Sequence, residues 1–473
     1  MSLIVYDLTL LVLFVIFSAV FLYLKRKNLS KDGPFYLYMT TWGLKLINYI
    51  GGKYKKTLKF LSYISVGWGY VLMMGILFLM VQTVYLYLTS PIARIIKAPP
   101  IAPLIPYFPK LFGLQSFFPP FYFVYFIVSI LIVATVHELS HGIFARRFGI
   151  KIKSTGFAFL KYFPALFGAF VEQDEKQMTK TKKFDQMSIL SAGVFANTLT
   201  AILFYIILFW FFTYTFAASG VAFDTYSYSP IGIANITSVN GVELTNPSYT
   251  NVLNLFNDTG FNKIKVGDRN YITTKEILLM QGEGLEEVFL YDDAPAINVD
   301  LGDIITEIGG IKIESIEQLG EEIGKYSPGE QIEITTIRGE GELKFMITLG
   351  ENPLDPEKPW IGVGFYDEMR KGFVGAVLSV LPSYTKPHVY YEPKNDLSLF
   401  VKDLLWWIVI INILVALFNM MPLGFLDGGR FFYLTFLGIT GKRKFSKKLF
   451  DVMTYFLLFL FVVLMVKWAA GFF

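Results

Sequence analysis

The stretch Val136-His137-Glu138-Leu139-Ser140-His141-Gly142 lies inside an otherwise apolar segment, about 121–147. On a helix, residues four positions apart share a face, so His137 and His141 can present two imidazoles to one metal ion. Glu138 lies beside them, where a general base is needed to activate a water molecule. Ionisable side chains at bilayer depth cost about 2.5–3.5 kcal/mol each on insertion scales, so they usually mark function. A polar helix-packing cluster is the alternative interpretation.

The composition indicates a membrane protein. Hydrophobic residues make up 54% of the chain and charged residues 17%, whereas soluble proteins average about 25% charged residues. We therefore expect a polytopic α-helical membrane protein that contacts the lipid bilayer, with some soluble portion and no nucleic-acid partner. The chain has no cysteine, which excludes disulfides, thiolate ligands and cysteine nucleophiles. A zinc site in this chain must use histidine and carboxylate ligands.

Six apolar segments are predicted to cross the bilayer: about 3–24, 59–89, 121–147, 187–217, 401–421 and 449–473. Lysines and arginines follow the first and third segments and precede the sixth, which places these ends in the cytoplasm. Arg146 is nine residues beyond His137, so the motif lies about 13 Å inside the cytoplasmic end of its helix. The candidate site is therefore predicted inside the membrane, toward the cytoplasmic side.

Four parts are predicted along the chain. Residues 1–120 hold two accessory N-terminal spans and loops, and residues 121–217 hold the spans of the catalytic core. Residues 218–371 form an inserted region, and residues 372–473 a linker and the last two spans. The inserted region has 26 acidic and 11 basic residues, whereas the rest of the chain has 12 acidic and 31 basic residues. This contrast, together with the alternation of the helix ends, favours an extracytoplasmic inserted region.

The inserted region has the pattern of a mixed α/β domain. Residues 294–313 predict short strands with a glycine turn, followed by a helix at about 316–325 and strands at about 331–338 and 341–349. This order resembles a PDZ domain of the kind appended to membrane and periplasmic proteases, which implies binding of peptide termini. The earlier stretch 229–244 resembles the same element, so we expect two units, the second at about 285–350. The first could instead be an inserted or split part of one domain.

Residues 151–185 predict a hairpin that dips toward the bilayer. Gly156-Phe-Ala-Phe-Leu and Phe167-Gly-Ala-Phe-Val lie on either side of Pro164, and irregular backbone at that depth must line a cavity or be covered by protein. We expect a strand that includes Gly156, Phe157 and Phe159 to bind an unwound substrate segment by strand addition.

A catalytic zinc ion needs a third protein ligand. The remaining histidine, His388, lies in the predicted external linker, on the wrong side of the membrane. Asp427 follows the fifth span on its cytoplasmic side, and the two glycines after it allow a tight turn and close helix approach. Asp-Gly-Gly alone is more often an ordinary turn. Paired with the histidine motif at a similar depth, Asp427 is the better third ligand.

Three motifs together resemble the site-2 protease family of intramembrane zinc metalloproteases. They are His137-Glu138-x-x-His141, Gly193-x-x-x-Asn197 and Asn419-x-x-Pro422-x-x-x-x-Asp427-Gly428. The resemblance covers the third, fourth and fifth spans, and the first two spans lie outside it. One departure is Val194, which stands where the family often has proline.

The resemblance implies a role for each matching residue. His137, His141 and Asp427 would hold one Zn²⁺ per chain, and Glu138 would take a proton from water and pass it to the leaving amine. Asn197 could stabilise the oxyanion or simply make an interhelical hydrogen bond. Asn419 could contact the substrate backbone or order the Asp427 turn.

The function implied by this resemblance is hydrolysis of peptide bonds within transmembrane segments of single-span membrane proteins, as in regulated intramembrane proteolysis. Two alternatives remain. The other membrane enzymes with this histidine motif trim prenylated peptides, but Asp427-Gly428 in a later apolar segment and the PDZ-like region speak against them. A PDZ-bearing membrane scaffold or transporter would lack protease activity and would not need stoichiometric zinc.

Overall fold

The computed structural model describes residues 3–89, 99, 104–115, 118–161, 167–282, 285–339, 341–366 and 384–470. They form two compact units. The helical unit comprises Met1–Phe211 and Leu399–Phe473, and the inserted unit comprises Phe212–Ser398. The tip of the predicted hairpin and much of the predicted linker after residue 371 lie outside the described residues.

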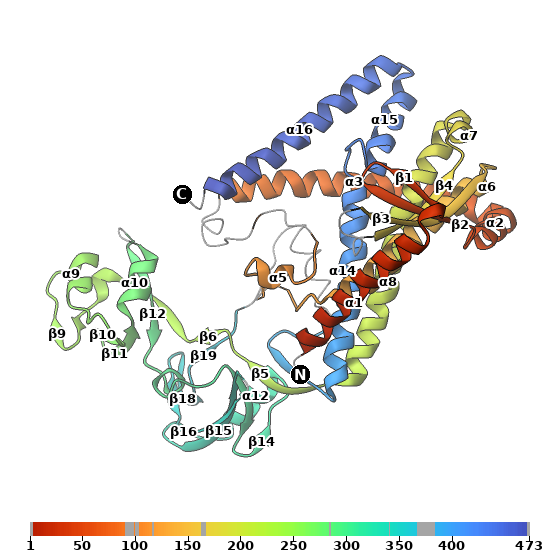
Figure 1. Ribbon diagram of the computed structural model, residues 1–473. Helices are drawn as coiled ribbons and strands as arrows, with labels where there is room; N and C mark the ends of the chain where they lie inside the picture. Colours follow the sequence, from red (N-terminus) through yellow and green to blue (C-terminus); the bar gives the residue numbers. More distant parts are fainter. Residues whose placement is uncertain are drawn as a thin grey trace. The chain divides into compact units, whose positions relative to one another are not determined.

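Among the described residues, six helices are long and apolar enough to cross a membrane (Figure 1). They are α1 (Leu3–Leu24), α3 (Lys55–Thr89), α6 (Phe123–Arg147), α8 (Lys183–Thr215), α14 (Asp396–Asn419) and α16 (Arg443–Ala470). The predicted number of spans is confirmed, and the chain is a multi-pass helical membrane protein. A shorter helix, α15 (Asp427–Thr440), lies between the last two spans and was not predicted.

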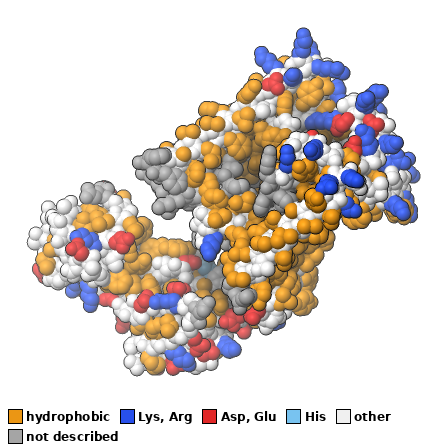
Figure 2. Space-filling view, in the orientation of Figure 1, with side chains coloured by type: hydrophobic (Ala, Val, Ile, Leu, Met, Phe, Trp, Pro, Cys, Tyr) orange, Lys and Arg blue, Asp and Glu red, His pale blue; other side chains and the backbone are white. Residues whose placement is uncertain are grey.

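The surface of the helical unit suits a bilayer. Large apolar side chains are exposed along α1 and α16, among them Phe17 at 65% and Phe459 at 62%. Exposed apolar surface on this scale marks contact with lipid or protein. Figure 2 shows lysine and arginine side chains gathered at one end of this unit, the end that carries α2 (Leu44–Lys53), α7 (Glu175–Lys180) and α15. Such a basic end is typical of a cytoplasmic face.

A four-stranded antiparallel sheet belongs to the helical unit. Its order is β1 (Leu29–Asp32), β2 (Phe35–Thr40), β3 (Ile152–Leu160) and β4 (Phe167–Gln173). The two sides of the predicted hairpin pair as the antiparallel strands β3 and β4, but no strands were predicted for β1 and β2. Because β2 pairs along β3, the strand beside α6 that keeps an open edge is β4.

Glycines allow α2 to pack closely on α6. A Cβ atom on Gly142, the residue after the histidine motif, would lie 2.9 Å from Cδ1 of Ile47. A Cβ atom on Gly51 would lie 2.8 Å from Cβ of Arg146. The basic segment after the first span therefore folds against the helix that carries the motif.

The second span is not peripheral to the predicted catalytic spans. The hydroxyl oxygens of Ser65 on α3 and Ser191 on α8 lie 2.6 Å apart in a buried hydrogen bond. Nearby, Nε1 of Trp68 donates to the hydroxyl of Thr198 at 2.9 Å. Polar contacts of this kind stabilise helix pairs in membranes, so α3 packs against α8 and stabilises it.

The first span contacts the start of α6 through Asp7, its one charged residue. The buried Asp7 carboxylate accepts hydrogen bonds from the backbone N–H groups of Phe123 (2.6 Å) and Val124 (3.0 Å) and from the hydroxyl of Tyr107. Tyr122, at the N-cap position of α6, supplies no side-chain bond of its own. Asp7 thus satisfies amides that a helix start leaves unpaired, and its charge suits the positive end of the helix dipole.

The inserted unit contains two larger sheets, each with its own hydrophobic core. The first has the order β7 (Tyr228–Gly232), β12 (Glu287–Asp292), β11 (Arg269–Thr273), β10 (Asn262–Val266), β8 (Ser238–Val239) and β9 (Val242–Glu243). The second has the order β16 (Gly341–Thr348), β15 (Gln331–Arg338), β13 (Ile304–Ile308), β5 (Phe216–Ala222) and β20 (Val389–Pro393), and β14 (Ile311–Lys312) pairs with β13.

Two predicted boundaries in this unit need correction. The second domain was expected to begin at about residue 285, but β12 pairs in the first sheet. The unit also extends beyond 218–371. β5, which begins before this range, pairs with β13, and β20, which follows it in the sequence, pairs with β5. The remaining elements are α5 (Phe108–Leu111), β6 (Thr225–Tyr226), α9 (Tyr249–Asn254), α10 (Lys275–Gln281), α11 (Pro295–Asn298), α12 (Ile316–Ile323), β17 (Gly350–Asn352), β18 (Asp355–Trp360) and β19 (Val363–Gly364).

Candidate metal centre

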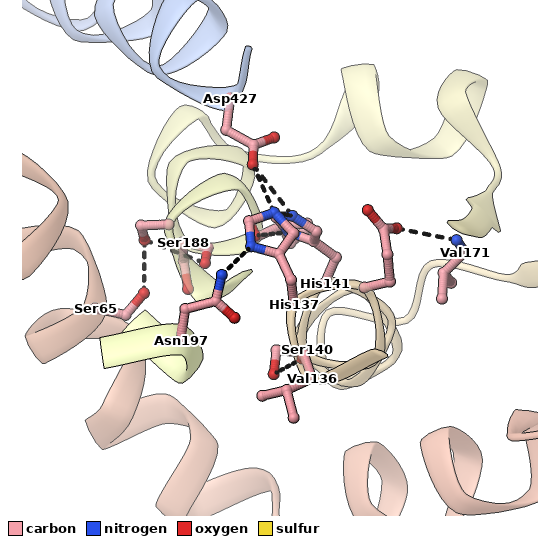
Figure 3. Close-up of polar contacts among 12 residues, drawn as sticks. Ser65, Val136, His137, Ser140, His141, Val171, Ser188, Asn197 and Asp427 are labelled. Carbon is pink, nitrogen blue, oxygen red and sulfur yellow. Dashed lines mark hydrogen bonds and ion pairs between the residues drawn. The ribbon is translucent and has the colours of Figure 1, made fainter. Parts of the chain in front are cut away.

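Three side chains from two helices meet at one point in the helical unit (Figure 3). His137 and His141 lie one turn apart on α6, and Asp427 is the first residue of α15. Nε2 of His137 lies 3.0 Å from Nε2 of His141. Oδ2 of Asp427 lies 3.2 Å from each of these nitrogens. The three residues that the sequence selected as ligands are therefore brought together.

The spacing of these atoms fits a zinc ion. Zinc binds histidine nitrogen and carboxylate oxygen at about 2.0–2.2 Å, so neighbouring ligand atoms of a tetrahedral site lie about 3.3 Å apart. The three observed separations, 3.0, 3.2 and 3.2 Å, are close to this value. A Glu138 oxygen also lies within 4.8 Å of the two imidazoles. The shorter distances favour Asp427 as the third ligand and leave Glu138 beside the centre.

The charge of the site also suits a divalent cation. With neutral imidazoles, the carboxylates of Asp427 and Glu138 give a local charge of minus two. The Asp427 side chain is 21% exposed, and its ion-pair partners among the described residues are the two histidines. A largely buried carboxylate that faces neutral imidazoles is costly unless a metal or hydrogen bonds compensate it.

The two glycines after Asp427 are required by close backbone contacts. A Cβ atom on Gly428 would lie 2.3 Å from the carbonyl oxygen of Met420, and one on Gly429 would lie 2.1 Å from that of Leu423. The turn between α14 and α15 therefore folds back onto the start of α15. Arg430 joins the start of α15 to α7, because its guanidinium lies 3.1 Å from the Glu175 carboxylate.

One face of α8 lies against both imidazoles. Nδ1 of His141 lies 2.7 Å from the carbonyl oxygen of Ile189. Nδ1 of His137 lies 3.1 Å from the side-chain nitrogen of Asn197. A Cβ atom on Gly193, between these two positions, would lie 2.6–2.7 Å from ring atoms of His137. The Gly193-x-x-x-Asn197 motif thus matches the shape of the His137 ring. The Ile189 carbonyl was missed, because every residue has a backbone carbonyl and the sequence does not mark this one.

Glu138 points toward the sheet. Its Oε2 atom accepts a hydrogen bond of 3.0 Å from the backbone N–H of Val171 on β4 (Figure 3). A small pocket adjoins this carboxylate. It lies between α6 and the sheet and is lined by residues that include Thr135, Thr155, Phe157 and Ala169. The candidate base therefore lies between the candidate ligands and β4.

The other predicted site residues are not candidate ligands, although Gly156 and Phe157 line the pocket beside Glu138. Gly156, Phe157 and Phe159 lie on β3, which pairs with β2 and β4, so the prediction that they form an edge strand is wrong. Asn419 is the last residue of α14 and is half-buried. His388 belongs to the inserted unit, where its Nδ1 lies 3.2 Å from the Asp224 carboxylate.

Comparison with known proteins shows the family of the chain. The model of peptidase family M50 matches residues 125–464, well over half of the chain. An uncharacterized protein of Methanocaldococcus jannaschii is 26% identical over 302 residues, which cover 64% of this chain and 54% of that protein. The zinc metalloprotease RasP of Shouchella clausii is 25% identical over 174 residues, which cover 32% of this chain and 41% of RasP. The chain thus spans about half the length of these relatives. It belongs to peptidase family M50, the site-2 protease family of zinc metalloproteases.

Proposed function

We propose that this chain is an intramembrane zinc endopeptidase that cleaves the transmembrane segments of single-span membrane proteins. One observation carries the proposal. Three ligand atoms lie 3.0–3.2 Å apart, with Glu138 beside them, on a helix long enough to cross the bilayer. A scaffold or transporter has no need of this arrangement. The single-span substrates and the role in regulated intramembrane proteolysis are part of the proposal.

Each residue has one task in this proposal. His137, His141 and Asp427 would hold the metal, which when bound would supply a Lewis acid that can lower the pKa of water to about 7. Glu138 would take a proton from the attacking water and deliver it to the leaving amine. Its hydrogen bond from Val171 fixes the carboxylate between the centre and the sheet. Asn419, at the end of α14, either contacts the substrate backbone or orders the turn before Asp427.

The proposed orientation places the site toward the cytoplasm and the inserted unit on the other side. Arg146 and Arg147 end α6, and Lys183 begins α8. Basic residues at these ends are typical of the cytoplasmic side. A tag on either unit, tested for protease access in sealed vesicles, distinguishes this orientation from the reverse.

The open edge of β4 is the surface that we propose for the substrate backbone. Val171 directs its N–H out of the sheet toward Glu138, so Val171 and Thr155 form a pair without hydrogen bonds between them. Alternation in an antiparallel ladder then directs the N–H and C=O of Ala169 out of the same edge. An unwound substrate strand can pair with these groups by strand addition. This places the substrate backbone about 4.8 Å from β4, on the side of that strand where Glu138 lies.

The substitution Ala169→Pro tests this surface. Proline removes only the outward N–H of Ala169 and is tolerated on sheet edges, so we expect the sheet to remain and kcat/KM to fall about 10-fold, the value of one lost hydrogen bond to a substrate. Ala169→Val, which keeps the N–H, is the control. Equal cleavage by both variants of a single-span substrate in proteoliposomes would exclude strand addition at β4.

We also propose that the inserted unit contains two PDZ-like modules that bind substrate termini or admit only trimmed substrates. Phe216 on β5 pairs with Pro393 on β20, so the two ends of this unit lie close together. Residues 217–392 can therefore be replaced by a short flexible linker that joins α8 to α14. We expect cleavage either to extend to untrimmed substrates or to lose its preferred ones. An unchanged substrate profile, measured by mass spectrometry of membrane fragments, would contradict both versions.

The deciding test of the proposed function uses the whole chain reconstituted in proteoliposomes. We expect one zinc per chain by elemental analysis and cleavage inside the transmembrane segment of a single-span substrate by mass spectrometry. A chelator should abolish cleavage, and added zinc should restore it. If the chain bound stoichiometric zinc but produced no more membrane fragments than the Glu138→Gln variant, the proposal would be refuted.

A further inference from the structure

The two imidazoles have the same orientation toward the metal centre. Nε2 of each ring faces the other ring and Asp427, while Nδ1 of each ring faces α8. A neutral histidine carries its one proton on one of the two nitrogens. If Nε2 is to bind a metal, the proton must lie on Nδ1, and each Nδ1–H then needs a hydrogen-bond acceptor on α8.

His141 has such an acceptor. The carbonyl oxygen of Ile189 lies 2.7 Å from its Nδ1 and can only accept a hydrogen bond. This contact keeps the proton on Nδ1 and leaves the Nε2 lone pair free for the metal. The backbone of α8 therefore sets the tautomer of one ligand.

His137 has the Asn197 amide in the corresponding place. The amide nitrogen lies 3.1 Å from Nδ1, so two donors face each other whenever Nδ1 carries the proton. At the same time, the Asn197 amide oxygen is buried and has no hydrogen-bond partner among the described residues. Turning the amide by 180° hardly changes its shape and exchanges the two atoms. The turned amide pairs its oxygen with Nδ1–H, which removes the facing donors and gives the buried oxygen a partner, while its NH2 group takes the place that the oxygen held.

We propose that Asn197 is a positioning residue that accepts a hydrogen bond from Nδ1 of His137 and holds its Nε2 ready for the metal. This inference rests on the proposed function, which requires a metal at the centre. Ile189, Gly193 and Asn197 are spaced four residues apart, so one face of α8 supplies an acceptor, a space for a ring and a second acceptor. The α8 helix would then set the tautomers of both histidine ligands.

This assignment differs from an oxyanion role for Asn197. A donor to the oxyanion must lie beside the metal, on the Nε2 side of the rings. Asn197 contacts His137 through Nδ1, on the opposite side of the imidazole ring from Asp427. The His137 ring therefore stands between the amide and the atoms that would react.

Three variants of the full chain test the proposal through zinc affinity, measured by competition with a chelator. Asn197→Leu removes the acceptor and should weaken zinc binding about 10–100-fold, the usual cost of losing a hydrogen bond behind a ligand. Asn197→Asp keeps an acceptor and loses the donor, so it should restore zinc affinity and keep measurable cleavage. Thr198→Val, next on the same helix, removes a bond to Trp68 but touches neither histidine, and should bind zinc like the wild type.

The outcomes separate the two roles. Wild-type zinc affinity in Asn197→Asp together with complete loss of cleavage would overturn the proposal in favour of an oxyanion donor. Wild-type zinc affinity in a folded Asn197→Leu chain, judged by its thermal unfolding without metal, would also overturn it. If the wild-type chain itself bound no zinc, the proposed function would be refuted. This result can be told apart from the two variant results above.

Discussion

Replacing Glu138 by glutamine is expected to reduce cleavage of a single-span substrate by about 10³-fold while one zinc per chain remains bound. Glutamine has nearly the same shape but cannot take up a proton, and general acid–base catalysis contributes typically about 10²–10⁴-fold. Its amide oxygen can still accept the N–H of Val171, so the side chain should stay in place. The rate is measured from product fragments by mass spectrometry, and the zinc by elemental analysis.

The matched control for this variant is Glu172→Gln. Glu172 follows Val171 on β4 and accepts a hydrogen bond from the Ser154 hydroxyl at 2.7 Å, away from the histidines. Its substitution removes one negative charge near the site without touching the proposed base, so cleavage should stay within a few-fold of wild type. Full cleavage by Glu138→Gln would refute the role of Glu138 in proton transfer. Loss of zinc from that variant would instead make Glu138 a metal ligand.

The spans and the pairing of the two histidines could be predicted because their signals are local. Hydrophobic length marks a span wherever it occurs in the chain, and spacing of four on a helix brings His137 and His141 together without knowledge of the fold. The prediction of Asp427 as a third ligand also required the depths of two different spans, which were estimated from basic residues at their ends. The match to peptidase family M50 confirms the family that these motifs predicted.

The contacts around the candidate ligands could not be predicted because they join segments that are distant in the sequence. They depend on strand pairing, on a backbone carbonyl and on a glycine that leaves room for a ring. β2 pairs with β3 across more than a hundred residues, and no local pattern in 25–58 indicated where that strand would add. This pairing decides that β4, rather than the strand with Phe157, has the open edge. The Ile189 carbonyl carries no sequence signal of its own, since every residue has one. Gly193 was visible as a motif, but its partner ring was not.

Substitution of Gly193 by alanine is expected to displace the His137 ring and so to disturb the candidate metal centre directly. The new Cβ atom would lie 2.6–2.7 Å from the His137 ring, well inside contact distance. The helix cannot easily retreat, because Ala192 and Val194 are fully buried and Ser191 is bonded to Ser65. The ring must then move and leave the 3.0–3.2 Å arrangement with His141 and Asp427.

We therefore expect Gly193→Ala to weaken zinc binding by about 100-fold and to cut cleavage at least as much, with a loss of about 1–3 kcal/mol of stability from overpacking. Gly67→Ala is the matched control, because Gly67 lies in the spanning helix α3 and its added Cβ would meet no atom within 4 Å. That variant should bind zinc normally and gain up to about 1 kcal/mol of helix stability. Equal zinc affinity in the two variants would mean that His137 does not lie against Gly193 in the metal-bound chain. The α8 face would then not be what places the ligand.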